Sequence, residues 1–444
     1  MGGLEKVDVL GEVLAKELEP QPAPALRTFG GRAFEASLRL RLHAPELAEQ
    51  VRRHVKTLHG RVRYVKHGAD LDGGIECSPM RKIWREALSG VIPYEAGKPL
   101  EALEKELGLP AILRLSSNES PLGPSPKVIE ALRREAPRAH LYPDGGSTAL
   151  REALGRRLGI SSDWIMAGNG GDEILGLIAR AAFEPGDEIL MPHPAFEPYD
   201  IETRLSGATP VRSPLRGYDT DLGDLLARVT ARTKAVFLCT PHNPATTIIR
   251  RGPLERFLEA LGDDPPLVVL DEAYRDFCDD PETADGALLA RRHPRLIALR
   301  TFSKIAGLAG LRLGYALAQP EVIDWLGRVR APFNVNRFAQ VAGVAALDDP
   351  EHLERTRALI LTERPRLLDE VARRGAPAPP SQANFILPRV GEQADALRAA
   401  LFKAGILVRE GTAVGFPGHL RISVGTREHN NRLLEVWDRT TSAR

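Results

Sequence analysis

One lysine is distinguished by its neighbours in the stretch "RTFSKIAGLAGLRLGY" (300–315). Lys304 follows Thr301 and Ser303, and Arg312 lies in the apolar, glycine-containing run behind it. A lysine amine is a poor nucleophile while it is protonated, but burial or a nearby cation lowers its pKa and frees it. The two hydroxyls and the guanidinium are suitable donors to a phosphate. The stretch therefore predicts a lysine that binds a phosphorylated aldehyde covalently, and the alternative is an ordinary surface lysine in a loop.

A carboxylate and a phenol close the apolar segment "PLVVLDEAY" (266–274). Asp271 stands where an unpaired carboxylate is costly to bury, and Tyr274 follows three residues later. Asp271 is either an N-cap for the next element or a partner for a ring nitrogen. In the second case it keeps a pyridinium protonated, so that the ring accepts electrons from a forming carbanion. Tyr274 would reach the same ring.

Two turns beside predicted elements add hydrogen-bond donors. In "MAGNGGDEILGLIARA" (166–181), Gly171 and Asp172 begin an amphipathic helix, and the backbone N–H groups of such a turn bind phosphate. In "FLCTPHNPATT" (237–247), Asn243 follows a buried strand, and its amide would donate to a phenolate oxygen. Each motif alone is more common as a plain turn.

Two arginines near the end of the chain are candidates for anion binding. Arg421 alternates with apolar residues in "HLRISVGTRE" (419–428), and Arg409 stands in "GILVRE". A half-buried arginine on a strand needs an anion as its partner. That anion is either a structural carboxylate or a group of the substrate.

The elements between about 165 and 320 would bring these residues together. Short apolar runs alternate there with helical patterns, which predicts a mostly parallel sheet with helices on both faces. Functional residues of such sheets gather at the carboxyl ends of the strands. The predicted strands are 187–192, 234–240, 266–274, 295–301 and 311–318, with helices at 171–183 and 252–262.

The two ends of the chain differ from this middle region. A long amphipathic helix is predicted at 350–375, with Pro365 as the place where it would bend. A strand–helix–strand–helix order follows it and predicts a smaller α/β domain. Residues 1–79 carry no catalytic motif, and they would form a small α+β module, an interface element or a partly disordered leader.

The composition predicts a globular chain of two or three domains. It has 444 residues, of which 43% are hydrophobic and 27% charged, and its formal net charge is +1. This charge gives no argument for a nucleic-acid or membrane partner. Cys77, Cys239 and Cys278 suit neither a disulfide framework nor a metal site. With no signal-peptide pattern and no bilayer-spanning run, the chain is expected to be soluble and cytoplasmic.

Taken in chain order, these motifs resemble the fold-type I pyridoxal-phosphate aminotransferases, and more specifically the histidinol-phosphate aminotransferases. The resemblance covers residues 80 to about 440. Further matching segments are "LRLSSNESPLGPSP", "LYPDGGSTALREAL", "GNGGDEIL", "DEAYRDF", "APFNVNRFAQ" and "LRISVGTREHN".

The resemblance implies an α/β fold with a large domain, in which helices flank a mostly parallel seven-stranded sheet, and a smaller C-terminal α/β domain. The implied boundaries are an extra N-terminal segment at 1–79, an arm at 80–142, the cofactor-binding domain at 143–330 and the small domain at 331–444. A homodimer with shared active sites is also implied.

The resemblance further implies a role for each matching residue. Lys304 would bind pyridoxal 5'-phosphate and move a proton in catalysis, with Asp271 on the pyridine nitrogen and Tyr274 on the phenolate oxygen. The other cofactor-binding residues would be Gly171, Asp172, Phe196, Asn243, Thr301, Ser303, Arg312 and, from the neighbouring subunit, Tyr142. The substrate would be bound by Arg421, Arg409, Asn118 and Tyr94.

The sequence departs from the family pattern at a few places. The Asn turn reads "PHNPATT" where the family usually has "PNNPTGT", so Ala245 and Thr246 replace a Thr-Gly pair. Phe196 stands where Tyr is frequent, and Ala96 replaces the usual proline of the arm. The first 79 residues lie outside the pattern, and Met80 would be the natural start if the leader is an over-extension.

The implied activity is transfer of an amino group between histidinol phosphate and 2-oxoglutarate in histidine biosynthesis. Alternatives within the family are an aromatic-amino-acid aminotransferase and a phosphothreonine decarboxylase. A different class is a transcription regulator with an aminotransferase-like domain. It would need a helix-turn-helix and a basic face in residues 1–79, and no convincing pattern of that kind occurs there.

Overall fold

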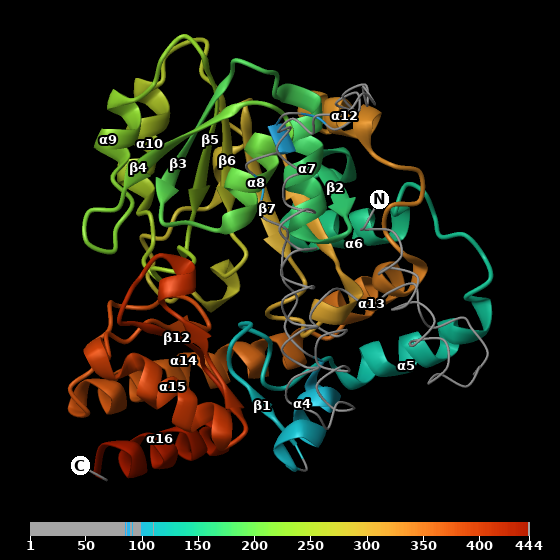
Figure 1. Ribbon diagram of the computed structural model, residues 1–444. Helices are drawn as coiled ribbons and strands as arrows, with labels where there is room; N and C mark the ends of the chain where they lie inside the picture. The colour runs from blue at the N-terminus through green and yellow to red at the C-terminus, as the bar shows by residue number, and fades with distance from the viewer. Residues whose placement is uncertain (1–84, 86, 89–90, 92–98, 110, 443–444) are drawn as a thin grey trace, which may run out of the picture. The chain divides into compact units, whose positions relative to one another are not determined.

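The computed structural model describes residues 85, 87–88, 91, 99–109 and 111–442. Its centre is a seven-stranded sheet (Figure 1). The neighbouring strands across the sheet are β2 (Ile165–Gly168), β8 (Gly314–Leu317), β7 (Leu296–Thr301), β6 (Leu267–Asp271), β5 (Thr233–Cys239), β3 (Glu188–His193) and β4 (Thr209–Pro214). Only β8 runs antiparallel to its neighbours. The mostly parallel seven-stranded sheet is thus confirmed, although the apolar runs did not identify β2 and β4.

Helices cover both faces of this sheet, because its central strands are apolar on both sides. One face packs against α7 (Gly170–Ala182), α8 (Glu197–Leu205) and α12 (Pro320–Val329). The other packs against α6 (Thr148–Leu158), α10 (Arg251–Ala260) and α13 (Arg337–Leu347). On β5, Phe237 belongs to the first core and Leu238 to the second.

The same alternation separates neighbouring polar residues at the carboxyl ends of β6 and β7. Asp271 lies two residues after Val269 on β6, so its side chain points to the same α7–α8 face as that of Val269. The side chain of the next residue, Glu272, points to the opposite face. On β7, Arg300 points to the face of Glu272. One side of the sheet edge is therefore free for a cavity, while the other holds charged partners.

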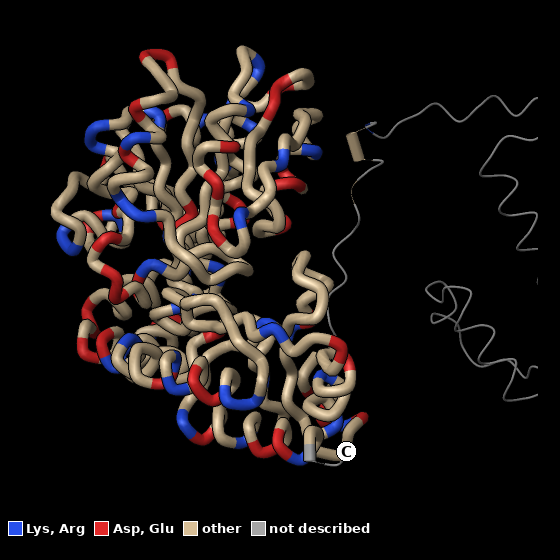
Figure 2. Tube along the Cα trace, turned by 90° about the vertical axis from the view of Figure 1, so that its left-hand side faces the viewer, with Lys and Arg blue, Asp and Glu red and all other residues tan. Residues whose placement is uncertain are grey.

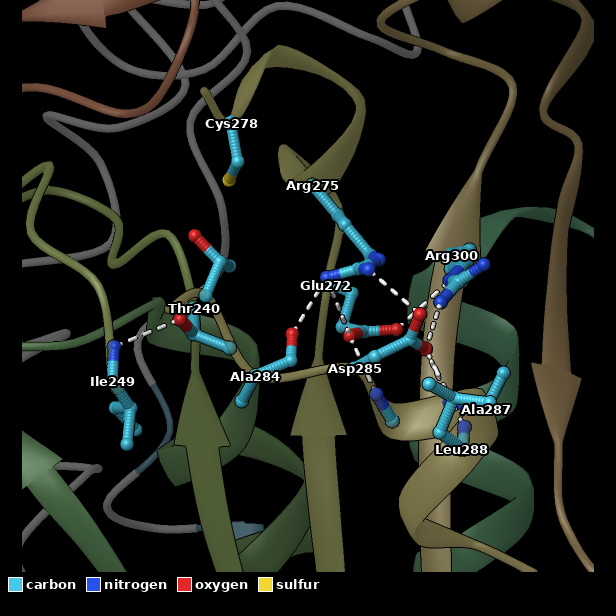
Figure 3. Close-up of polar contacts among 12 residues, drawn as sticks. Thr240, Ile249, Glu272, Arg275, Cys278, Ala284, Asp285, Ala287, Leu288 and Arg300 are labelled. Atoms are coloured by element: carbon cyan, nitrogen blue, oxygen red, sulfur yellow. Dashed lines mark hydrogen bonds and ion pairs between the residues drawn. The ribbon is translucent and has the colours of Figure 1, made fainter. Parts of the chain in front are cut away.

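A cluster of four charged residues around the buried Glu272 supports this edge from behind, as Figure 3 shows. The Glu272 side chain is 0% exposed, and its Oε2 lies 2.8 Å from Nε of Arg300, whose side chain is 12% exposed. Asp285 accepts from Arg300 at 3.0 Å and from Arg275 at 2.7 Å. Burial alone would lower the pKa of Arg300, but Glu272 and Asp285 raise it overall. The cluster ties β6 to β7 and to the start of the short helix α11 (Gly286–Leu289).

The C-terminal part of the chain forms a second, smaller α/β arrangement. Its long helix α14 (Pro350–Arg373) continues through Pro365. The elements after it are β9 (Phe385–Ile386), α15 (Ala394–Lys403), β10 (Ile406–Leu407), β11 (Arg409–Glu410), β12 (Leu420–Ser423) and α16 (Arg427–Ser442). The three-stranded sheet has the order β11-β12-β9, and β10 pairs in parallel with β1 (Leu113–Arg114). This agrees with the predicted strand and helix order of the tail.

The remaining helices are α4 (Leu100–Leu107), α5 (Pro126–Glu135) and α9 (Leu222–Ala227). Basic and acidic residues are interspersed along the described chain (Figure 2). None of the helices in the described ranges is long and apolar enough to cross a membrane. Residues 1–79 of the expected leader lie outside the described residues.

We expect Glu272→Gln to lower the free energy of unfolding by about 3 kcal/mol, because it leaves the buried Arg300 guanidinium short of one negative partner. Urea unfolding measures this change. The matched control is Glu282→Gln, since Glu282 pairs with Arg251 at 3.5 Å while both side chains are 51% exposed. That variant should change the unfolding free energy by less than about 0.5 kcal/mol. Equal effects of the two variants would contradict a bracing role for the cluster.

Candidate active site

A cavity of about 260 Å³ opens at the carboxyl ends of the central strands. It collects residues that are far apart in the sequence, because parallel strands end at one edge of the sheet. Of the residues predicted for the site, the cavity is lined by Gly171, Asp172, Phe196, Asn243, Asp271, Tyr274, Thr301, Ser303, Lys304 and Arg312. It is also lined by Ser117, Glu119, Leu175, Cys239 and Ala273.

Asp271 ends β6 as a buried carboxylate at the wall of this cavity. Its Oδ2 accepts a hydrogen bond from the Tyr199 hydroxyl at 2.6 Å, and its Oδ1 accepts from the backbone N–H of Ala273 at 3.0 Å. Burial raises the pKa of Asp271, while these two bonds lower it. Among the residues that the structure describes, no Lys, Arg or His forms an ion pair with it. A carboxylate in this position is suited to a cationic group of a ligand.

Lys304 presents an amine whose pKa is lowered to about 8, first by burial and then by the charge of Arg421. Arg312 lowers the pKa further but contributes less than Arg421. The sequence suggested Arg312 for this effect and not Arg421. The Nζ atom donates to the backbone oxygen of Ser117 at 3.2 Å and lies 5.5 Å from the centre of the Tyr274 ring. At a pKa of about 8, roughly a tenth of this amine is unprotonated at pH 7, against less than about a thousandth for an ordinary lysine.

The turn before α7 and the side chain of Arg312 form a site suited to an anion in the wall of the first cavity. Gly170 has a φ of +83°, and a Cβ added there would lie 2.7 Å from Nη2 of Arg312. A Cβ on Gly314 would lie 2.9 Å from the backbone of Gly170 and Gly171. Both positions therefore require glycine. Arg312 also pairs with Asp172 at 3.1 Å, which holds the guanidinium beside the free N–H groups of the helix start.

Asn243 is oriented by Arg421 from the C-terminal sheet. Nη1 of Arg421 donates to Oδ1 of Asn243 at 2.8 Å, and Nη2 donates to the Ser116 backbone oxygen at 2.8 Å. Because an arginine can only donate, this contact assigns the Asn243 oxygen without ambiguity. The Asn243 amide nitrogen is then the atom available to donate to a ligand in the cavity.

Tyr274 is held in a comparable way by Asn118. Nδ2 of Asn118 donates to the Tyr274 hydroxyl at 3.1 Å, so the hydroxyl keeps its own proton for another acceptor. Asn118 is 1% exposed and does not line the cavity. Its Oδ1 accepts from Ser423 at 3.1 Å, and its backbone oxygen accepts from Asn384 at 3.1 Å. The structure thus places Asn118 behind Tyr274 rather than inside the cavity.

Arg409 lies apart from the first cavity and lines a second one of about 700 Å³. Phe196, the residue before α8, lines both cavities and so separates them. Arg409 stands opposite Arg421 in the antiparallel pairing of β11 with β12. The two arginines therefore come from one small sheet, but only Arg409 lines one of the two cavities that Phe196 borders.

Tyr142, like Asn118, Arg409 and Arg421, does not line the first cavity. The Tyr142 side chain is 78% exposed and stacks on Phe333 with ring centres 4.8 Å apart. Tyr94 lies outside the described residues. Within the described ranges, no group of three or more His, Cys, Asp or Glu could hold a metal ion.

Sequence reasoning missed Tyr199, which is fully buried and stacks on Phe237 with ring centres 4.9 Å apart. Its position three residues after Phe196, on a short amphipathic helix, was the available signal, since a buried tyrosine needs a partner for its hydroxyl. The serine and asparagine that hold Asn118, Ser423 and Asn384, had no local signal at all. They reach the site only through pairing in the small sheet.

Comparison with known proteins assigns the family. The model of the family described as aminotransferase class I and II matches residues 110–436. The histidinol-phosphate aminotransferase of Anaeromyxobacter is 43% identical over 80% of this chain and 98% of its own length. That of Symbiobacterium thermophilum is 42% identical over 79% of this chain and 97% of its own length.

A solved structure gives the same result at the level of the fold. The histidinol-phosphate aminotransferase of Sinorhizobium meliloti, in complex with pyridoxal-5'-phosphate, superposes with a TM-score of 0.74. It is 29% identical to this chain, and the match covers 82% of this chain and 98% of the other. The chain therefore belongs to the class I and II aminotransferase family.

Proposed function

We propose that this chain is a pyridoxal-phosphate-dependent enzyme that transfers the amino group of L-histidinol phosphate to 2-oxoglutarate, giving imidazole acetol phosphate and L-glutamate. The observation that carries this proposal is the 43% identity over 98% of the length of a curated histidinol-phosphate aminotransferase. The reaction would serve histidine biosynthesis, and the protein would act in the cytoplasm.

The residues of the cavity fit this cofactor by their chemistry. Asp271 is a buried carboxylate with no cation in the described chain, and a protonated pyridine nitrogen would supply one. Lys304 offers an amine with a pKa lowered to about 8 for the aldehyde. Gly170 and Gly314 keep side chains away from the anion site in which Arg312 would meet the phosphate. The amide of Asn243 and the hydroxyl of Tyr274 would both donate to the phenolate oxygen.

When bound, the cofactor supplies an electron-accepting ring that stabilises negative charge at the substrate carbon. The chain would supply the proton transfers and the orientation. The Lys304 amine would be the base that moves a proton away from the substrate Cα. Asp271 would keep the ring nitrogen protonated, and Phe196 would limit the position of the ring from one side.

The substrate anions would be bound by Arg421 and Arg409. Arg421 is fixed by Asn243 and by the Ser116 backbone oxygen, so its guanidinium is already oriented. Arg409 lines the adjoining cavity with Arg204, Arg212 and His193. The amine of histidinol phosphate, on the carbon between its two arms, would lie beside Lys304, and one of the arms would extend into the adjoining cavity.

We further propose a homodimer, in which Tyr142 of one subunit would reach the phosphate in the other. This is supported by the exposure of Tyr142 and by its stacking on Phe333, which would present both rings to a partner. The domain boundaries at 79, 142 and 330 belong to the same proposal.

The substrate assignment is tested by steady-state turnover with histidinol phosphate, phenylalanine, tyrosine and phosphothreonine, each with 2-oxoglutarate. We expect kcat/KM for histidinol phosphate to exceed the others by at least about tenfold, or roughly 1.4 kcal/mol of transition-state discrimination. A preference for an aromatic amino acid, or release of carbon dioxide from phosphothreonine, would overturn it.

The state of Lys304 predicts how loading of the cofactor depends on pH. Only the unprotonated amine attacks an aldehyde, so the rate at which the visible band forms on mixing with pyridoxal phosphate should rise with pH. It should level off just above pH 8, because the pKa of Lys304 is lowered to about 8, whereas an ordinary lysine would give a rise up to about pH 10.

Stopped-flow absorbance measures this rate. Arg421→Met should move the midpoint to higher pH, since Arg421 is the cation with the largest effect on Lys304, and Lys304→Met should form no covalent band. A wild-type rate that still rises tenfold per pH unit near pH 9.5 would show that the amine is not activated.

A further inference from the structure

The loop that carries Asn243 contains a residue in an unfavourable backbone conformation. Thr246 has a φ of +71° and is 0% exposed. A β-branched residue rarely adopts the left-handed region, and such strain persists only where surrounding contacts hold it. The family pattern that this turn resembles usually has glycine at this position, a residue that adopts such a φ without strain.

The contacts of Thr246 explain how this conformation is held. Its backbone N–H donates to the oxygen of His242 at 2.8 Å, and its backbone oxygen accepts from the N–H of Gln382 at 3.1 Å. Its side-chain hydroxyl donates to the backbone oxygen of Pro380 at 3.0 Å. A glycine could make the first two bonds but not the third. The hydroxyl is therefore what this chain adds to the loop.

The segment 380–383, which makes two of these three bonds, also contacts the turn that follows Tyr274. Oε1 of Gln382 accepts from the backbone N–H groups of Asp279 at 2.8 Å and Asp280 at 3.2 Å. Nη1 of Arg364, on α14, donates to the oxygen of Phe277 at 2.8 Å and to that of Ala383 at 3.2 Å. Residues 380–383 thus contact both loops that carry the proposed donors to the phenolate oxygen, Asn243 and Tyr274. We call residues 380–383 the brace.

His242 stabilises the same loop from inside. Its Nδ1 accepts from the backbone N–H of Ala245 at 3.1 Å, which requires a neutral ring with the proton on Nε2. Burial lowers the pKa of His242 to about 4, so the ring keeps this acceptor at neutral pH. The loop that carries Asn243 is therefore held by His242 within the loop and by the brace from the neighbouring segment.

We propose that Thr246 is a positioning residue whose hydroxyl clasps the Asn243 loop to the brace and thereby sets the direction of the Asn243 amide at the cavity wall. The claim rests on the proposed function, since it is the bound cofactor that would receive this amide. Thr246 acts through Asn243 and does not line the cavity.

Three variants separate the hydroxyl from the shape of the residue. Thr246→Val keeps the β-branch and the volume but loses the hydroxyl, whereas Thr246→Ser keeps the hydroxyl and loses the branch. Thr246→Ala lacks both and serves as a second hydroxyl-free variant if the valine protein folds poorly. All are compared with the wild-type chain at full length.

The first measurement is amide hydrogen exchange in the cofactor-free protein. Without the hydroxyl, the peptides that cover 240–249 and 380–385 should exchange at least about tenfold faster, because one buried hydrogen bond is lost and the Pro380 oxygen is left without it. The serine variant should stay within about threefold of wild type. Equal exchange in the valine and wild-type proteins would overturn the clasp.

The second measurement is the pH midpoint of the visible band of the Lys304-linked cofactor. A donor to the phenolate oxygen withdraws charge from the lysine nitrogen and eases loss of its proton, so a loosened Asn243 should raise the midpoint by about half a unit. Faster exchange with an unchanged midpoint would overturn the positioning role. A wild-type protein that forms no band would contradict the proposed function instead, while the exchange data would still decide the clasp.

Discussion

The structure depends on one buried carboxylate that has no positive partner in the described chain. Asp271 is held by the Tyr199 hydroxyl and one backbone N–H, and neither of these neutralises its charge. Removing such a charge from water is costly unless a cation or several donors compensate. Tyr199 is itself fixed by stacking on Phe237, so the carboxylate cannot turn away. The cavity is therefore built for a ligand that brings a cation to this point.

The sheet makes this arrangement possible by sending adjacent side chains to opposite faces. Asp271 and Thr301 face the cavity, while their neighbours Glu272 and Arg300 form the ion cluster on the other side. The strand ends are thereby fixed from behind by an ion cluster whose carboxylates, Glu272 and Asp285, do not line the cavity. The same logic applies to the C-terminal sheet, from which Arg421 reaches across to orient Asn243.

The sequence was sufficient for the fold class and for residues that stand at the ends of apolar runs. Lys304, Asp271 and Asn243 could be found because each follows a recognisable strand, and the resemblance assigned their chemistry. The contacts that orient them could not be found in this way. Tyr199 meets Asp271, and Asn118 meets Tyr274, across long separations in the chain. Such pairs depend on strand register and helix packing, which leave no local pattern.

Thr246, at a position where the family pattern usually has glycine, is a second case in which the sequence alone does not predict the contacts of a residue. From the sequence it is only a departure whose effect on the loop is open. The structure resolves it, because the φ of +71° and the bond to Pro380 show both the strain and the contact that accompanies it. The hydroxyl that glycine would lack thus makes a contact of its own in this loop.

The claim that Asp271 requires a cationic ring is tested most directly by a ligand comparison. The affinities of wild-type and Asp271→Asn proteins are measured for pyridoxal phosphate and for its 1-deaza analogue, in which a C–H group replaces the ring nitrogen. The wild-type protein should prefer pyridoxal phosphate by about a hundredfold, as expected for a buried charge left unpaired. In Asp271→Asn this preference should nearly vanish. An equal preference in both proteins would contradict the account.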